Sequence, residues 1–324
     1  MPERTEWSVS DPRTLEIDET ITALHVRIVG GTVNIVGAAD TGPARVEISE
    51  VSGPPLTIRR EAQTLTVTYD DLPWKSLLTM VGRETWNRTA VISVTVPAAT
   101  RVEVGAVGAS AVVSGISGRT ELRGVTGDST LVGLTGPVRA ETVSGRVEGQ
   151  AVTGDLSFHS VSGDLTLLEG AGSSVRADSV SGDMVLDLDP AANGSDVRLT
   201  TVSGEVAIRL PAPGDTRVDA NTAGGTVANA FEDLRVSGRW GAKRITGRLG
   251  SGSGTLKVTT VSGGLALLRR PPSEEHLGDG EAGGQRSARR TPGAAAPNDN
   301  VTANGGAAAP REPQDDSPAD EKVL

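Results

Sequence analysis

The residues that could carry out chemistry are few and scattered along this chain. The three histidines, His25, His159 and His276, have no spacing typical of a metal site, and there is no cysteine. The stretch 278–283 fits the letters of a dinucleotide-binding G-x-G-x-x-G motif, but it follows no predicted strand and opens no predicted helix, so we interpret it as a chance match. The P-loop and the G-x-S-x-G nucleophile motif are absent. We therefore expect no catalytic site, no metal site and no bound cofactor.

One polar feature does repeat, directly after a recurring glycine. The residues in this place are Asp128, Arg146, Asp164, Asp183 and Glu205, with Asp155 at the corresponding place of an alternate repeat. If the repeats stack as strands about 4.8 Å apart, Asp164, Asp183 and Glu205 form an acidic ladder that could hold a cation through oxygen ligands. The other interpretation is turn chemistry, in which Asp after Gly is favoured and faces water. The calcium-binding repeat G-G-x-G-x-D is absent.

The recurring glycine closes a tripeptide marker, apolar–hydroxyl–Gly, that returns every nine residues between Ile116 and Gly163. The copies are Ile116-Ser117-Gly118, Val125-Thr126-Gly127, Leu134-Thr135-Gly136, Val143-Ser144-Gly145, Val152-Thr153-Gly154 and Val161-Ser162-Gly163. A fixed short period of this kind indicates a solenoid. After the glycine, apolar and polar residues alternate, which predicts a short strand with one buried face. The buried positions of two units are expected to be Val152, Leu156 and Phe158, then Val161, Leu165 and Leu167. Glycine is expected to supply the bend by accepting a positive φ.

Nine residues are too few to form a coil around a packed core. We therefore expect two units per coil, with three units per coil as the alternative. Beyond Gly163 the markers continue at wider spacing, at 180–182, 202–204, 224–225, 245–247 and 261–263. This pattern predicts an all-β fold, a parallel β-helix or solenoid with coils of roughly 18–22 residues stacked coil on coil. Right-handed coils are the default for parallel crossovers.

The composition changes along the chain predict three regions. Residues 1–100 are predicted to form a β-rich region, which is either sandwich-like or an irregular start of the solenoid. Either form would cover the solenoid's N-terminal edge. The repeats occupy 101–268. From 269 to 324 Ala, Gly, Pro, Asp and Glu dominate without periodicity, which predicts a disordered tail.

The segment 72–88 interrupts the strand pattern with apolar residues among cationic ones. It is interpreted either as a short helix or loop docked on the sheet, or as a contact with a partner or a membrane surface. The residues that would make this contact are Trp74, Leu77, Leu78, Val81 and Trp86.

Charge and hydropathy limit the classes of partner. The net charge is −10, the pI is about 4.9 and only 2% of the residues are aromatic, so we expect no nucleic-acid partner. No signal peptide and no run of apolar residues long enough to span a membrane is evident. The expected location is cytoplasmic, with peripheral membrane contact open.

The unit Val161-Ser162-Gly163-Asp164-Leu165 and its relatives at Val180, Val202 and Val261 resemble a bacterial family, the putative-adhesin, β-strand-repeat domain of unknown function. Residues 23–31 and 71–75 look like the version of this domain found in GC-rich Gram-positive bacteria. The resemblance extends over residues 6–272. It implies a β-helical fold, no known enzymatic activity, and roles in surface adhesion or envelope-stress signalling.

Two functions from different classes follow. The first is a non-enzymatic β-solenoid scaffold that binds a protein or envelope partner through 72–88 or an exposed strand face. The second is a carbohydrate-binding or polysaccharide-degrading β-helix. An acidic cleft lined with Trp would favour the second, and a smooth Ser/Thr/Asp exterior would favour the first. A polymerising solenoid is a third hypothesis that would require uncapped ends.

Overall fold

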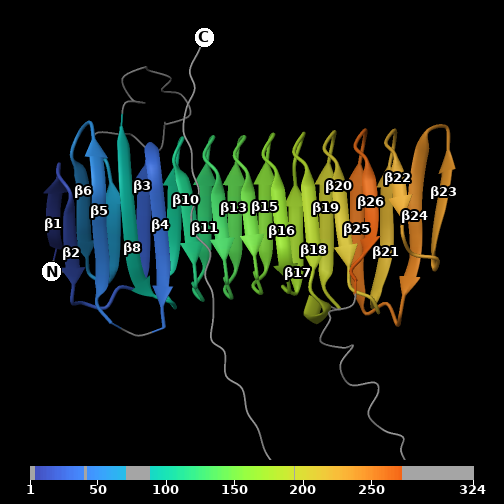
Figure 1. Ribbon diagram of the computed structural model, residues 1–324, viewed down its shortest axis with the longest axis horizontal. Helices are drawn as coiled ribbons and strands as arrows, with labels where there is room; N and C mark the ends of the chain where they lie inside the picture. The colour runs from blue at the N-terminus through green and yellow to red at the C-terminus, as the bar shows by residue number, and fades with distance from the viewer. Residues whose placement is uncertain (1–3, 40–41, 71–87, 193, 272–324) are drawn as a thin grey trace, which may run out of the picture. The chain divides into compact units, whose positions relative to one another are not determined.

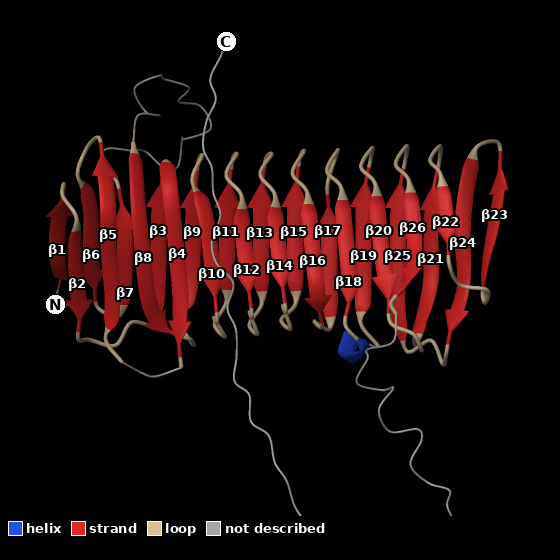
Figure 2. Cartoon of the chain, in the orientation of Figure 1, coloured by secondary structure: helices blue, strands red, loops and turns tan. Residues whose placement is uncertain are grey.

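The computed structural model describes residues 4–39, 42–70, 88–192 and 194–271. The predicted contact residues Trp74, Leu77, Leu78, Val81 and Trp86 lie outside the described residues, as does the predicted tail from residue 272. The described chain is almost entirely β, with one short 3₁₀ helix at Pro190–Ala192 (Figure 2). Its strands form two large sheets, here called the first sheet, of 14 strands, and the second sheet, of 12 strands.

In the middle of the chain, successive strands alternate between the two sheets (Figure 1). The first sheet receives β9 (Arg101–Ala106), β11 (Thr120–Gly124), β13 (Val138–Thr142), β15 (Leu156–Ser160), β17 (Ser174–Asp178) and β19 (Asp196–Thr201). The second sheet receives β10 (Ser110–Ser114), β12 (Ser129–Val132), β14 (Val147–Gln150), β16 (Leu165–Gly170), β18 (Met184–Leu188) and β20 (Val206–Leu210). Neighbouring strands within each set are parallel. Each coil therefore gives one strand to each sheet.

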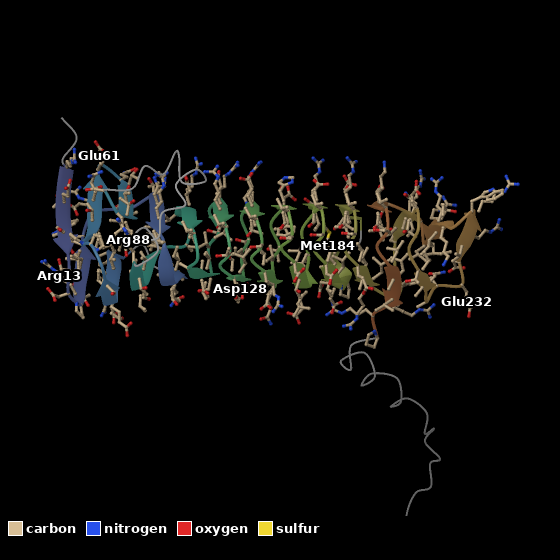
Figure 3. The ribbon with its side chains drawn as sticks, turned by 90° about the horizontal axis from the view of Figure 1, so that it is seen from above. Arg13, Glu61, Arg88, Asp128, Met184 and Glu232 are labelled. Atoms are coloured by element: carbon tan, nitrogen blue, oxygen red, sulfur yellow. The ribbon has the colours of Figure 1, made fainter. Side chains whose placement is uncertain are left out.

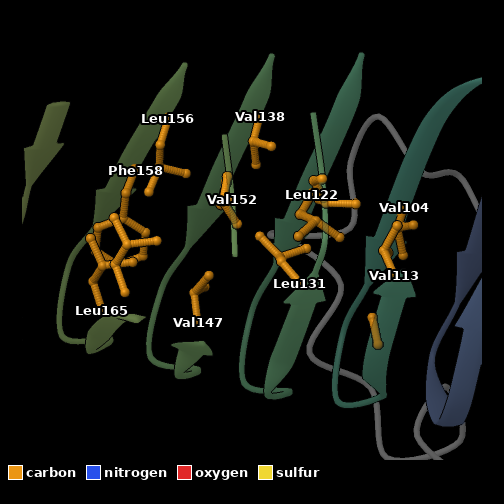
Figure 4. Close-up of a cluster of buried hydrophobic side chains, with 14 of the residues drawn as sticks. Val104, Val113, Leu122, Leu131, Val138, Val147, Val152, Leu156, Phe158 and Leu165 are labelled. Atoms are coloured by element: carbon orange, nitrogen blue, oxygen red, sulfur yellow. The ribbon is translucent and has the colours of Figure 1, made fainter. Parts of the chain in front are cut away.

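The register of these strands stacks like positions of the repeat on one another. Val138 lies beside Leu156, and Leu156 lies beside Val175. In the next inward row Phe158 lies between Ala140 and Ala177, so a large side chain is flanked by two small ones. Aliphatic side chains from both sheets meet between them and form one continuous core (Figure 4).

The first hundred residues extend the same two sheets. The strands are β1 (Arg4–Val9), β2 (Arg13–Ile17), β3 (Ala23–Ile28), β4 (Gly30–Ala38), β5 (Ala44–Ser52), β6 (Leu56–Glu61), β7 (Thr64–Thr68) and β8 (Thr89–Pro97). β3 and β4 pair in parallel with β9 and β10, and β7 and β8 lie in parallel on their other side. Beyond them β6 and β5, then β1 and β2, close this end with antiparallel pairs.

At the far end the strands do not follow one another in chain order. β25 (Gly254–Thr260) lies between β19 and β21 (Thr216–Thr222), and β26 (Leu265–Arg269) lies between β20 and β22 (Val227–Asn229). The last coil of the sequence thus fills a place inside the stack. The antiparallel strands β24 (Ala242–Leu249) and β23 (Leu234–Arg239) then extend the first sheet.

This arrangement corrects one predicted marker. Ile245-Thr246-Gly247 lies within β24 and forms no turn, because Ile245 pairs across the antiparallel ladder with Ala220 and is buried. An apolar–hydroxyl–Gly tripeptide can fit a plain strand as well as a coil turn, so the motif alone does not distinguish them.

Candidate functional site: the exposed valine edge

The marker tripeptides fall into two classes that differ in the burial of their apolar residue. Ile116, Leu134 and Val152, at turns from the second sheet to the first, are at most 2% exposed. At turns from the first sheet to the second, Val125 is partly buried against the core, and the valines of the later turns are far more accessible, with exposed fractions of 38% for Val143, 52% for Val161, 51% for Val180, 45% for Val202 and 50% for Val261. The expectation that Val161 is buried like Val152 is therefore wrong.

The five exposed valines form one unbroken row, here called the valine ridge: Val143, Val161, Val180, Val202 and Val261. Backbone hydrogen bonds link neighbouring coils at this edge. The amide of Ser162 donates to the Val143 carbonyl at 2.8 Å, and the amide of Ser181 donates to the Val161 carbonyl at 2.9 Å. The amide of Val261 donates to the Val202 carbonyl at 3.2 Å, so the row continues across the displaced last coil.

The hydroxyl groups beside the ridge form hydrogen bonds to the backbone of the turns. Each marker serine donates to the valine carbonyl of the preceding coil, for example Ser162 Oγ to the Val143 carbonyl at 3.2 Å. The residue before each valine is Ser or Thr, and its oxygen accepts from the marker glycine, as in Gly182 N to Ser179 Oγ at 2.9 Å. The same bond joins Gly145 to Thr142, Gly163 to Ser160, Gly204 to Thr201 and Gly263 to Thr260. The methyl groups of the valines are therefore what this edge offers to a partner.

The residue before the marker is the sequence signal that separates the two classes. Ser or Thr precedes the exposed valines, whereas Gly115, Gly133 and Ala151 precede the buried residues and have φ angles of 66°, 61° and 52°. A left-handed residue there lets the chain turn its next side chain inward. The ridge was not predicted from the sequence, because the marker tripeptides of the two classes have the same apolar–hydroxyl–Gly pattern.

The predicted acidic ladder lies beside these turns, and its carboxylates bind the backbone of the next coil. Asp164 Oδ1 accepts from the amide of Asp183 at 3.0 Å, and Asp183 Oδ1 accepts from the amide of Glu205 at 2.7 Å. Asp128 accepts in the same way from the backbone amide of Arg146 at 2.9 Å (Asp128 is labelled in Figure 3). Within the described part of the chain, no group of three or more His, Cys, Asp or Glu residues could hold a metal ion. The geometry is that of turn chemistry.

The outer face of the first sheet carries a network of ion pairs. The buried carboxylate of Glu121 accepts from Arg119 Nε at 2.8 Å, from Arg101 at 3.0 Å and from Arg123 at 3.3 Å. Arg123 also bonds to Glu103 at 3.2 Å, so the network crosses neighbouring strands.

Further along the same face, the guanidinium of Arg139 hydrogen-bonds to Glu141 and lowers the pKa of that carboxyl. An open hollow of about 360 Å³ above Ser157 is lined by Arg119, Arg139, Asp155 and Arg176. Cations and carboxylates alternate over this face, as on a solvated surface.

Residues 21–268 match the model of the Toastrack DUF4097 family. This chain belongs to the Toastrack DUF4097 family. No curated protein matches the chain. No helix among the described residues is long and apolar enough to cross a membrane.

Two solved structures are similar to this Toastrack chain at low identity. One is a putative cell adhesion protein from Clostridium sporogenes, with 13% identity and a TM-score of 0.29, covering 83% of this chain and 100% of that one. The other is a putative adhesin from Bacteroides fragilis, with 11% identity and a TM-score of 0.43, covering 82% of this chain and 97% of that one.

Proposed function

We propose that this Toastrack chain is a non-enzymatic, adhesin-like binding or scaffold protein of the cell envelope whose partner contacts the valine ridge. The observation that carries the proposal is the row of five valines, each 38–52% exposed, in adjacent coils. Single exposed apolar residues are ordinary on a protein surface, but an unbroken apolar row bordered by polar groups is typical of an interaction site.

The ridge is also rigid, which favours binding. Its backbone is held by hydrogen bonds between coils, and the branched side chains of its valines are restricted at χ1. A preformed surface loses little conformational entropy when a partner binds, so more of the apolar burial appears as affinity.

The exterior supports this function over a polysaccharide-degrading one. The hollow with the mixed charges is open, and its lining residues include no Trp. The exposed Trp240 lies at the far end of the stack, in a segment without carboxylates. Four open hollows are lined by described residues; only the one beside Trp240 contains a Trp, and no carboxylate lines that hollow.

The test is a crosslinking pull-down from the native cell with a ridge variant carrying Val161→Ser, Val180→Ser and Val202→Ser. These side chains are half exposed, so the fold is expected to survive, with the melting temperature changed by only a few degrees. We expect a partner captured by the unmodified chain to be lost from the ridge variant.

The matched control replaces three other exposed apolar residues, Leu168, Val185 and Leu268, by Ser on the outer face of the second sheet. The control is expected to keep the partner. Loss from both variants, or retention by both, would contradict a ridge contact. A third variant, Trp74→Ala with Leu77→Ala and Leu78→Ala, tests the segment proposed from the sequence. Turnover of a polysaccharide by the purified chain would contradict the non-enzymatic function.

A further inference from the structure

The hairpin of β23 and β24 extends the first sheet past the end of the second sheet. The second sheet ends at β22, whereas the first continues through β24 to β23 (Figure 1). Phe231 and Leu234 are buried and close the core here, and the side-chain Nδ2 of Asn229 donates to their backbone carbonyl groups at 2.8 and 3.2 Å. Ile245 is consequently buried, but its cross-strand neighbour Val236 is 53% exposed.

The tip of the hairpin presents Trp240 to solvent. Arg239 pairs with Ala242, so Trp240 and Gly241 form a two-residue loop. Their φ angles are 55° and 90°, as a type I′ turn requires. Asn or Asp is the usual first residue of such a turn, and a bulky residue at positive φ is disfavoured. Trp240 is 99% exposed, so burial within the chain does not explain why a Trp occupies this turn position.

The hairpin is also strongly cationic in an acidic protein. Residues 234–249 contain Arg235, Arg239, Lys243, Arg244 and Arg248 and no Asp or Glu, although the whole chain has a net charge of −10. Arg244 is paired with Asp219 at 2.6 Å. Among the residues that the structure describes, no carboxylate lies at ion-pair distance from the other four cations.

We propose that the β23–β24 hairpin docks on an anionic lipid bilayer, with Trp240 at the level of the headgroups and Arg239 and Lys243 against anionic headgroups. An indole is amphipathic and is enriched at membrane–water interfaces, and cations beside it are attracted by the negative surface of anionic lipids. The open hollow beside Trp240 is formed by Val236, Gly238, Ala242 and the two cations. The apolar groups of this surface suit the region beside the lipid chains, and its cations suit the anionic headgroups, from which no carboxylate of the hollow would be repelled.

The test is cosedimentation of the full chain with phosphatidylcholine vesicles, with and without phosphatidylglycerol. We expect binding only to the vesicles that contain phosphatidylglycerol, and release at high salt because exposed charges are screened. Neutralising Lys243 by Lys243→Ser is expected to lower the partition coefficient about fivefold, since one cation near such a surface contributes about 1 kcal/mol. Arg176→Ser removes the same charge from the outer face of the first sheet, and is expected to leave binding unchanged.

The decisive variant is Trp240→Asn, because Asn suits the turn and keeps the hairpin folded. We expect the partition coefficient of this variant to fall at least severalfold. We also expect the difference between the emission spectra of the unmodified chain and the variant, which reports Trp240 alone, to shift to the blue when vesicles are added. Equal binding to both vesicle types, no binding, or binding unaffected by Trp240→Asn would overturn the proposal. Trp240-dependent self-association without vesicle binding would overturn it in favour of a contact between copies. Val180→Ser, on the ridge, is expected to bind vesicles normally, which separates this proposal from the proposed function.

Discussion

At the scale of single residues, the marker glycines are required by close stacking and not by a left-handed backbone. A Cβ added to Gly145, Gly163, Gly182 or Gly204 would lie 1.9–2.3 Å from the carbonyl oxygen of the marker glycine in the preceding coil. None of these four glycines has a positive φ. The expectation that they supply a bend through positive φ is therefore wrong, because the coils approach each other too closely at this edge for any side chain.

Gly182→Ala tests this close approach. The new methyl group would lie 1.9 Å from the Gly163 oxygen, so the backbone must move, and we expect a loss of roughly 2–4 kcal/mol in the free energy of unfolding by urea denaturation. Gly224→Ala is the matched control, since the nearest atom would be 3.7 Å away, and it is expected to change stability by less than about 1 kcal/mol. Equal losses in the two variants would contradict the explanation.

At the scale of elements, one carboxylate joins β21 to the loop that enters β25. Asp215, directly before β21, accepts from Ser251 Oγ at 2.8 Å, Gly252 N at 2.6 Å and Ser253 Oγ at 2.7 Å. These donors stabilise the ionised carboxyl and lower its pKa from 3.8 to about 2. The link holds the returning chain at the place where the last coil enters the stack.

Asp215→Asn is expected to lower the melting temperature at neutral pH, with a pH dependence that follows from the lowered pKa. The stabilisation is present above the unfolded-state pKa near 3.8 and is lost as the pH falls toward about 2, where the native carboxyl gains its proton. The difference in melting temperature between the two chains should therefore shrink between about pH 4 and pH 2. Asp11→Asn, at an exposed turn, serves as the control. A difference that stays constant down to pH 2 would show that the carboxylate charge is not the cause.

At the scale of the whole described unit, the last coil acts as an internal layer. In a solenoid each coil contacts its neighbours only, so stability is approximately a sum over the interfaces between coils. Because β25 and β26 lie between β19 and β20 on one side and β21 and β22 on the other, their loss would remove two interfaces in each sheet.

A chain that ends at Ser253 is therefore expected to melt at least roughly 10 °C lower than the full chain and to lose hydrogen-exchange protection in β21 and β24. A chain that ends at Pro271 keeps every described strand and provides the comparison. If the two truncated chains melted alike, the order of the strands in this stack would be wrong.

The sequence by itself determined the local features of the fold. The nine-residue marker predicted short strands and a solenoid, and the alternation at Leu156 and Phe158 predicted which side chains face the core. These features depend on residues close together in the chain, through strand periodicity and turn composition. The resemblance to the family was also available from the sequence, and the match over 21–268 confirms it.

The tertiary structure decided which copies of the motif face water and where the last coil lies. Val152 and Val161 share the marker pattern and differ locally at the preceding residue, Ala151 against Ser160; one turn leads into the first sheet and the other into the second, so only Val152 points inward. The place of β25 depends on pairing with β19, which is distant in the chain, and the motif at 245–247 looks the same in a strand as in a turn. Trp240 showed no pattern in the sequence, because its exposure follows from the two sheets ending at different strands.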